Sequence, residues 1–565
     1  MTKKWWHQII GYQIYPRSFQ DSNHDGQGDI PGITAHLDDL KDLGINTLWL
    51  CPVNRSPMLD SGYDASDYDA VDPMFGNMDD MRQLIDEAQK RDIRVIMDLV
   101  VNHTSTEHPW FQAALQNPEG EYGGYYVIKE GQNGNPPNDW QAFFGGSAWE
   151  QIGETNRYYL HLFTKWQPDL NWENPKLRRE IYDMINRWLD MGIAGFRVDS
   201  INHLKKNFSG ETSKEDIYAD FTNVEGIGTF LSELRDETYG ARGAVTIGEV
   251  NGIRDDQMEA YVGENGYFST MFDFTGMRYR IQSPEWKGRR VEMMNGFRSE
   301  LMESQQKTPE TVLLCNVMEN HDTPRVGERF YEPEYVNFYS KSMLGAIGFF
   351  LRGIVFLYQG QTIGMTDYPK ERIEQFRDFA TYNLYQEYQK QGMTASEALA
   401  KLNAESREHA RTPMQWGGEA YGGFSDASPW FDVNPNYREI NLQVQKENEH
   451  SLYSFYKKMI ALRKREDLRD IFIYGETVPC FETQDGIIAY ERHLGGQSVI
   501  VLCNTNTEKT EVLPDRPITI KEQLLNNYDA DEDKLGKAEK ISLKPMQVLV
   551  FALSESKYRE RKDGV

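Results

Sequence analysis

The stretch GFRVDSINH at residues 195–203 places Arg197 two residues before Asp199, at the end of a run that is typical of a buried strand. Side chains at positions i and i+2 of a strand point to the same face, so the guanidinium and the carboxylate are expected to lie together. Such a pair is either a buried salt bridge that only fixes packing, or a device that keeps a reactive carboxylate ionised. The residues at the ends of other strands decide between these two interpretations.

Three other predicted strands also end in carboxylates or histidines. The stretch DLVVNH carries Asp98 and His103, IGEV ends its strand with Glu249, and ENHD carries His321 and Asp322. Taken singly, Glu249 could complement a helix N-terminus, Asp322 could be a helix N-cap, and the histidines could be core residues. Together the acids could supply a nucleophile, a proton donor and negative charge facing an oxocarbenium-like centre, which is the chemistry of glycoside cleavage.

The elements that must position these residues predict a barrel. Short β-branched or aromatic runs alternate with amphipathic helical stretches, a rhythm that is typical of parallel strands joined by right-handed crossovers. The eight strand candidates are YQIYP, NTLWLCP, RVIMDLVVNH, IAGFRVDS, AVTIGEV, YFSTMFDF, VLLCNVMEN and GIVFLYQG. The expected fold class is therefore α/β with a (β/α)8 TIM barrel, whose C-terminal mouth would gather the strand-end acids.

Two departures from this rhythm divide the chain of 565 residues. A stretch rich in Gly, Asn, Pro and aromatic residues follows strand three and is too long for an ordinary loop, which favours an inserted subdomain. Near the end, alternating strands predict an antiparallel β-sandwich domain. The expected domains are the catalytic barrel over residues 1–103 and 169–470, the inserted subdomain over 104–168 and the C-terminal β domain over 471–565. A helical insertion is also expected at about 365–410, and a solvated acidic loop at 529–534.

Composition excludes several classes of protein. The formal net charge of −26 would repel phosphates, so a nucleic-acid partner is not expected. No apolar run reaches the roughly 20 residues that span a bilayer, and the N-terminus lacks the apolar core of a signal peptide, so a cytoplasmic protein without a membrane partner is expected. The four cysteines contain no CxxC pair and are interpreted as reduced. The chain is expected to be a monomer or a weak oligomer.

The stretches DLVVNH, GFRVDSINH, IGEV and ENHD, in this order and spacing, resemble the conserved regions of the α-amylase family, glycoside hydrolase family 13. The resemblance covers nearly the whole chain. It implies that Asp199 is the nucleophile, Glu249 the general acid/base and Asp322 the third carboxylate, which stabilises the transition state. The residues that the resemblance places around the bound sugar are Asp98, His103, Arg197, His203 and His321.

Two further stretches, QPDLNWENP and ARTPMQW, are similar to oligo-1,6-glucosidases, dextran glucosidases and related α-glucosidases. In that subgroup an aspartate and an arginine grip the terminal glucose, and a closed pocket of this kind implies an exo-acting enzyme. The residues implied for this pocket are Asp60, Tyr63, Asp64, Gln167 and Arg411, with Tyr63 and Phe144 as aromatic floors.

The resemblance predicts a retaining exo-acting α-glucosidase that removes α-1,6-linked glucose, and also α-1,4-linked glucose, from short oligosaccharides such as isomaltose. Ser200 follows the nucleophile, whereas relatives with α-1,6 preference tend to carry valine there and those with α-1,4 preference threonine, so the linkage stays open. A transglucosidase or sucrose isomerase, and a trehalose-6-phosphate hydrolase, are alternatives on the same scaffold. A non-enzymatic relative, like the heavy chains of amino-acid transporters, is a further alternative.

The loop DSNHDGQGD near the N-terminus has oxygen-bearing side chains at alternate positions, a spacing that suits Ca²⁺. Similar loops in the related glucosidases hold a metal, so a structural Ca²⁺ is expected, with Mg²⁺ as an alternative and without an organic cofactor. A loop held by Asx turns alone is the other interpretation. The expected ligands are Asp21, Asn23, Asp25, Gln27 and Asp29.

Overall fold

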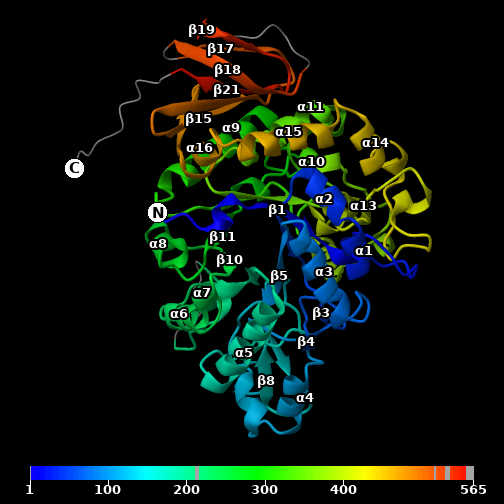
Figure 1. The fold of residues 1–565 in the computed structure, drawn as a ribbon. Coiled ribbons are helices and arrows are strands. Elements are labelled where there is room, and N and C mark those ends of the chain that lie inside the picture. Colours follow the sequence, from blue (N-terminus) through cyan, green and yellow to red (C-terminus); the bar gives the residue numbers. More distant parts are fainter. Residues whose placement is uncertain (1, 210–215, 515–516, 529–534, 555–565) are drawn as a thin grey trace.

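The computed structural model describes residues 2–209, 216–514, 517–528 and 535–554. Eight parallel strands close into a barrel in the order β1-β13-β12-β11-β10-β9-β5-β2, which confirms the predicted TIM barrel (Figure 1). The acidic stretch at 529–534 lies outside the described residues. The barrel strands are β1 (Ile10–Ile14), β2 (Thr47–Leu50), β5 (Arg94–Val100), β9 (Gly195–Asp199), β10 (Val245–Gly248), β11 (Thr270–Asp273), β12 (Cys315–Asn316) and β13 (Ile354–Tyr358).

The register of the barrel strands sets the height of the strand-end residues. Asp98 of β5 pairs with Arg197 of β9, and Ile247 of β10 pairs with the same arginine on its other side. Below this level the barrel interior is filled by bulky side chains such as Trp49 and Phe272. The polar residues therefore stand on a packed apolar floor, as expected for the C-terminal mouth of such a barrel.

Helices cover the outside of the barrel, and their ends carry recognisable caps. Asn77 forms a capping box with Asp80 at the start of α3, and Gly192 ends α5 in a left-handed conformation at φ 112°. The helices that surround the barrel are α1 (Ile30–Ala35), α2 (Leu37–Leu43), α3 (Met78–Lys90), α5 (Pro175–Met191), α6 (Ile227–Glu237), α7 (Tyr239–Arg242), α8 (Met258–Val262), α9 (Arg290–Lys307), α10 (Val326–Phe330), α11 (Phe338–Phe349), α14 (Leu442–Glu447), α15 (Leu452–Lys464) and α16 (Arg469–Tyr474).

The segment after β5 has its own sheet and its own apolar core. Strands β6 (Ile128–Glu130), β8 (Arg157–Leu160) and β7 (Trp149–Gln151) form an antiparallel sheet behind helix α4 (Pro109–Gln116). Its core includes Trp140, Trp149 and Leu160. After β13, helices α12 (Phe379–Lys390) and α13 (Ala395–Glu405) occupy the region where a second helical insertion was predicted.

The C-terminal β domain packs one face of its main sheet on the barrel. That sheet runs β14-β15-β16-β21-β18-β19, and a second sheet, β17-β20, covers its other face. Within β15, Ile488 and Tyr490 belong to the barrel-side core, whereas Ile487 and Ala489 face the second sheet, as alternation along a strand requires. The strands are β14 (Glu476–Cys480), β15 (Ile487–Leu494), β16 (Gln497–Asn504), β17 (Thr510–Val512), β18 (Ile518–Asn526), β19 (Gly536–Ala538), β20 (Ile541–Leu543) and β21 (Val548–Leu553).

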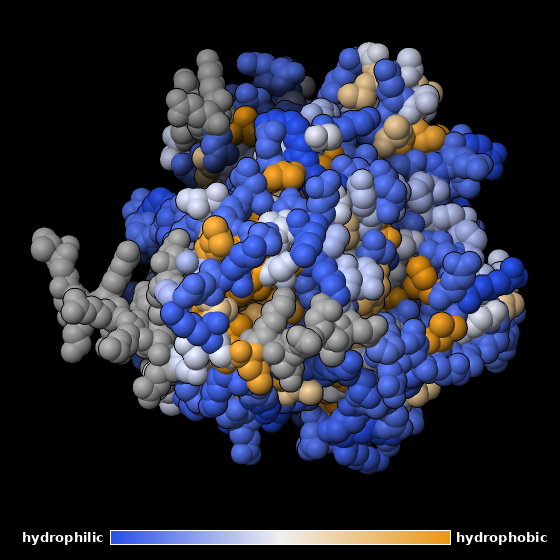
Figure 2. All heavy atoms as spheres, turned by 90° about the horizontal axis from the view of Figure 1, so that it is seen from above, coloured by the Kyte–Doolittle hydropathy of each residue, from blue (hydrophilic) through white to orange (hydrophobic). Residues whose placement is uncertain are grey.

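The C-terminal domain and the segment after β5 lie at opposite ends of the molecule (Figure 1). The face seen in Figure 2 is mostly hydrophilic, with small groups of hydrophobic residues between the charged ones. Among the described residues, no helix has the length and apolar character needed to cross a membrane. The four cysteines form no disulfide in this structure.

Candidate active site

The centre of the site is a single buried guanidinium that contacts three carboxylates. Nη1 of Arg197 lies 2.6 Å from Oδ1 of Asp98 and 2.6 Å from Oδ1 of Asp199, and its Nη2 lies 2.8 Å from Oε2 of Glu249. The arginine side chain is 3% exposed, so these ion pairs are shielded from solvent. Strands β5 and β9 and the end of β10 thus converge on one cation, as the sequence predicted.

The chain turns sharply directly after Asp199. Ser200 adopts a left-handed conformation at φ 44°, which is uncommon for a residue other than glycine. This turn aims the backbone N–H of Ser200 at Oε2 of Glu249, 3.0 Å away, while the N–H of Glu249 donates to Val198. The strained residue therefore fixes the two carboxylates relative to one another.

Burial and mutual repulsion separate the proton affinities of these acids. Burial raises the pKa of Asp199 to about 6, although Arg197 works in the opposite direction. Burial, together with the negative charges of Asp199 and Asp322, raises the pKa of Glu249 to about 7. Burial likewise raises the pKa of Asp98 to about 6. The direction of the effect of Arg197 agrees with the sequence interpretation that it favours the ionised form of Asp199, although desolvation outweighs it.

Asp322 stands in a more positive environment than the other two acids. Its Oδ1 lies 2.9 Å from Nη2 of Arg411 and 3.2 Å from Nη1 of Arg407, and its Oδ2 lies 3.1 Å from Nε2 of His321. Burial alone would raise the pKa of Asp322, but its contacts with His321, Arg407 and Arg411 lower it below its usual value. Burial lowers the pKa of His321 itself to about 3, so near neutral pH the two arginines supply the positive charge. Asp322 is therefore the most acidic of the three carboxylates.

Tyr63 and His321 form one wall of the site. The tyrosine hydroxyl lies 2.6 Å from Nε2 of His321 and donates to Oδ2 of Asp98 at 3.2 Å. The two rings stack with centroids 5.5 Å apart and planes 10° apart. Gln13, on β1, holds the other imidazole nitrogen at 2.7 Å. The wall is thus fixed from both sides, with an aromatic face that suits a sugar ring.

A polar wall adjoins Tyr63 and is built from side chains of four loops. Nε2 of Gln167 donates to Oδ2 of Asp60 at 3.0 Å and lies 3.1 Å from Nε2 of His103. Oδ1 of Asp60 in turn lies 3.1 Å from Nη2 of Arg407, which also contacts Asp378 at the start of α12. The resemblance placed Asp60 and Arg411 in this pocket and named no partner for the aspartate.

The arginine that contacts Asp60 is Arg407, which the sequence analysis did not name. Both arginines reach Asp322, but only Arg407 also reaches Asp60; Arg411 turns its Nη1 to Oγ of Ser61, 3.2 Å away. Sequence reasoning missed Arg407 because it lies just outside the quoted ARTPMQW stretch. Arg407 lies four residues before Arg411, and this spacing was the signal in the sequence that could have placed both arginines at the same site.

Three other predicted residues have supporting positions. The carboxylate of Asp64 is fully buried and accepts hydrogen bonds from Ser56 and from the N–H groups of residues 59 and 60, so it shapes the loop and cannot grip a sugar. His203 bonds through Nδ1 to the carbonyl of Phe221 and packs in an aromatic cluster, and burial lowers its pKa to about 4. The ring of Phe144 lies 5.6 Å from the guanidinium carbon of Arg407, at the edge of the site.

The predicted metal loop is held together by its own backbone. Asp21, Asn23 and Asp25 each accept a hydrogen bond from the N–H two residues further on, at 2.9–3.1 Å. Asp29 caps α1, and the side chain of Gln27 accepts from Arg17. The described part of the chain contains no group of three or more His, Cys, Asp or Glu side chains placed to hold a metal ion. The geometry matches the Asx-turn interpretation, while the donor types suit a hard cation.

The chain is similar in sequence to known glucosidases over nearly its whole length. The chain is 39% identical to the oligo-1,6-glucosidase of Parageobacillus thermoglucosidasius, over 98% of this chain and 100% of that protein. It is 38% identical to the glucan 1,6-alpha-glucosidase of Streptococcus pneumoniae serotype 4, over 94% of this chain and 97% of that protein.

The fold is also similar to those of solved structures. The trehalose-6-phosphate hydrolase of Bacillus licheniformis superposes with a TM-score of 0.89 and 34% identity, over 98% of this chain and 100% of that chain. An isomaltulose synthase variant of Erwinia rhapontici NX5 gives a TM-score of 0.92 and 32% identity, with the same coverage. Residues 13–473 match the α-amylase catalytic domain. The chain therefore belongs to the α-amylase family of glycoside hydrolases.

Proposed function

We propose that this protein is a retaining, exo-acting α-glucosidase of the oligo-1,6-glucosidase type. The observation that carries the proposal is that Asp199 and Glu249 contact the same guanidinium and differ in proton affinity, with pKa values of about 6 and about 7. Two adjacent carboxylates of which one is ionised and the other protonated are what a double-displacement glycosidase requires.

Each carboxylate has a defined part in the proposed reaction. Glu249 gives its proton to the glycosidic oxygen as the bond from that oxygen to the anomeric carbon breaks, and the carboxylate of Asp199 bonds to the same carbon. The ionised Glu249 then takes a proton from water, whose oxygen displaces Asp199 and releases glucose with its original configuration. Asp322, held ionised by its positive neighbours, stabilises the cationic sugar of the transition state.

The polar wall supports cleavage from the end of a chain. Gln167, Asp60 and Arg407 form a connected polar group next to Tyr63, and in the proposed function this group ends the pocket, so that a terminal glucose can enter but the chain cannot continue past it. The α-1,6 linkage is proposed from the two relatives, whose names specify 1,6-glucosidases. Ser200 matches neither residue expected for a strict linkage preference, so α-1,4 links are included in the proposal.

The choice between this function and its alternatives is tested by product analysis. Purified protein is offered isomaltose, maltose, sucrose, panose and trehalose 6-phosphate side by side, and the released sugars are identified. We expect glucose from isomaltose and panose, since the site holds one terminal glucosyl unit. Isomaltulose formed from sucrose would instead establish an isomerase, and cleavage of the phosphorylated disaccharide alone would establish a trehalose-6-phosphate hydrolase.

Substitution of the two carboxylates separates their roles. We expect Glu249→Gln to slow isomaltose hydrolysis by about 10²–10⁴-fold, the usual contribution of a general acid. The loss of the first step should be much smaller with a 4-nitrophenyl glucoside, whose leaving group needs no proton. Asp199→Asn should abolish turnover of both substrates, because no covalent intermediate can form. Pre-steady-state release of nitrophenol measures the first step, and equal losses for both substrates in Glu249→Gln would contradict its assignment.

The pH dependence follows from the same pair. Activity requires Asp199 ionised and Glu249 protonated, so it should fall below about pH 6 as Asp199 gains a proton and above about pH 7 as Glu249 loses one. We therefore expect a bell-shaped profile of kcat/KM, whose two limbs report the pair as a unit. The profile is measured with isomaltose between pH 4 and 9; constant activity up to pH 9 would rule out Glu249 as the acid.

We also propose that residues 21–29 hold a structural Ca²⁺, with Mg²⁺ as the alternative ion. The support is the row of oxygen donors at Asp21, Asn23 and Asp25, next to the buried Asp29. If a cation binds the native loop, it stabilises the fold by mass action, so millimolar Ca²⁺ should raise the Tm and EDTA should lower it. An Asp25→Ala variant, which removes an exposed donor, should lose this response. An identical Tm in Ca²⁺ and EDTA would show that Asx turns alone hold the loop.

The setting proposed for this enzyme is the cytoplasm, where thiols remain reduced, and the absence of disulfides between its four cysteines suits that setting. The proposed state is a monomer or weak oligomer acting on a small oligosaccharide. Fractionation of the source cells and light scattering of the purified protein are the measurements that decide both points.

A further inference from the structure

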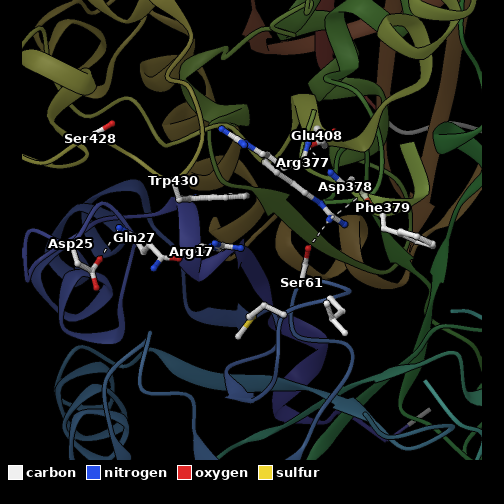
Figure 3. Close-up of a pocket in the computed structure, with 13 residues that line it drawn as sticks. Arg17, Asp25, Gln27, Ser61, Arg377, Asp378, Phe379, Glu408, Ser428 and Trp430 are labelled. Carbon is white, nitrogen blue, oxygen red and sulfur yellow. Dashed lines mark hydrogen bonds and ion pairs between the residues drawn. The ribbon is translucent and has the colours of Figure 1, made fainter. Parts of the chain in front are cut away.

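A second cavity lies beside the proposed glucose pocket. It has a volume of about 540 Å³, within the range of roughly 300–1,000 Å³ that is usual for small-molecule sites. The loops that line it follow β1, β2 and β13, and Figure 3 shows how their side chains surround the hollow. The lining residues are Arg17, Asp25, Gln27, Met58, Leu59, Ser61, Arg377, Asp378, Phe379, Glu408, Arg411, Ser428 and Trp430.

The cavity is separate from the three carboxylates but shares a wall with them. None of Asp199, Glu249 and Asp322 lines it. Arg411 forms part of the shared wall: its Nη2 contacts Asp322 at 2.9 Å, while its Nη1 donates to Ser61 at 3.2 Å. A molecule in the cavity would therefore be divided from the sugar being cleaved by the arginine that holds Asp322.

Two aromatic side chains lie on opposite sides of the hollow. Trp430 and Phe379 lie on opposite sides of the group of side chains drawn in Figure 3. The indole is fixed by a hydrogen bond from Nε1 to Oγ of Ser18 at 3.1 Å and by the guanidinium of Arg17, 4.0 Å from its ring centre. Phe379 is fixed by an edge contact with Trp166 at 4.7 Å. Aromatic groups held in place before binding present apolar surface at little entropic cost.

Polar groups line the remainder of the hollow and are balanced in charge. In the described ranges of the chain, no group forms a hydrogen bond or ion pair with the guanidinium of Arg377, whose backbone N–H donates to Glu408. Asp378 is neutralised by Arg407. In total three guanidinium groups and three carboxyl groups line the cavity, from Arg17, Arg377, Arg411, Asp25, Asp378 and Glu408. Arg411 pairs with Asp322 as Asp378 does with Arg407, so these pairs leave the balance unchanged, and burial raises the pKa of Glu408 to about 7.

This balance decides what kind of ligand the cavity suits. A phosphate would gain from the arginines but would meet three carboxylates, and a cation would meet the reverse. A neutral ring rich in hydroxyl groups can donate to the carboxylates, accept from the arginines and place its apolar face on Trp430 or Phe379. We propose that this cavity is a second saccharide site, which binds one neutral glucosyl unit, such as released glucose, independently of the unit being cleaved.

The proposed site goes beyond the proposed function and does not depend on it, because binding of glucose can be measured without turnover. Its occupant would hydrogen-bond to Arg411 and Ser61, on the far side of Asp322. Glucose in the cavity should therefore alter the kcat/KM of the glucosidase reaction, since Arg411 positions Asp322, to which the proposed reaction assigns stabilisation of the transition state.

Counting bound glucose tests the proposal. In equilibrium dialysis with radiolabelled glucose, the full chain should bind two molecules at saturation, one in the glucose pocket and one in the cavity. Trp430→Leu removes an aromatic side and should bind one, while Trp286→Leu, a matched change remote from the cavity, should still bind two. One bound glucose in the unaltered protein, or two in a folded Trp430→Leu protein, would overturn the proposal.

A second variant and two competing ligands serve as additional controls. If Trp430→Leu fails to fold, as judged by thermal melting, the exposed Arg377→Ala serves as the second variant and should weaken the second site by about tenfold or more, the loss expected for one good hydrogen bond to a charged group. Inorganic phosphate and glucose 6-phosphate are added as competitors. Displacement of the second glucose by phosphate would show an anion site and so overturn the assignment to a neutral saccharide.

Discussion

The active site depends on one buried cation that is shared by three acids. Arg197 contacts Asp98, Asp199 and Glu249, and without its charge these carboxylates would repel one another in a site that water does not screen. One positive charge cannot neutralise three negative ones, so at least one acid must hold a proton near neutral pH. Burial and the negative charges of Asp199 and Asp322 raise the pKa of Glu249 to about 7, which favours this acid as the one that holds the proton. The arginine therefore holds the three carboxylates close together. Because its single charge does not balance all three, one of them, Glu249, can stay protonated and act as the general acid.

In the polar wall, too, buried carboxylates are held by shared arginines. Asp322 is ionised because two arginines and a histidine surround it, and Arg407 in turn links it to Asp60 and Asp378. This chain of ion pairs joins loops that follow different barrel strands, including the helical insertion after β13. The closed end of the pocket is consequently a tertiary feature, and a change at Arg407 would disturb substrate fit and the ionisation of Asp322 together.

Sequence reasoning predicted the parts of the structure that depend on local pattern. Strand and helix periodicity gave the barrel, and the strand-end positions of Asp199 and Glu249 brought them together because parallel strands share one mouth. It failed where a long side chain crosses between loops. Nothing in the local pattern says whether Arg407 or Arg411 reaches Asp60, or that Asp64 turns into its own loop. The order of proton affinities was also beyond reach, because burial, and not the adjacent arginine, sets the pKa of Asp199.

Ser200 connects the backbone turn after the nucleophile to the proposed proton donor. It lies in the left-handed region at φ 44°, and its hydroxyl is 3.5 Å from Oε2 of Glu249. The N–H of the same residue holds that oxygen at 3.0 Å. A substitution here therefore acts first on the orientation of the acid, through the turn that follows β9.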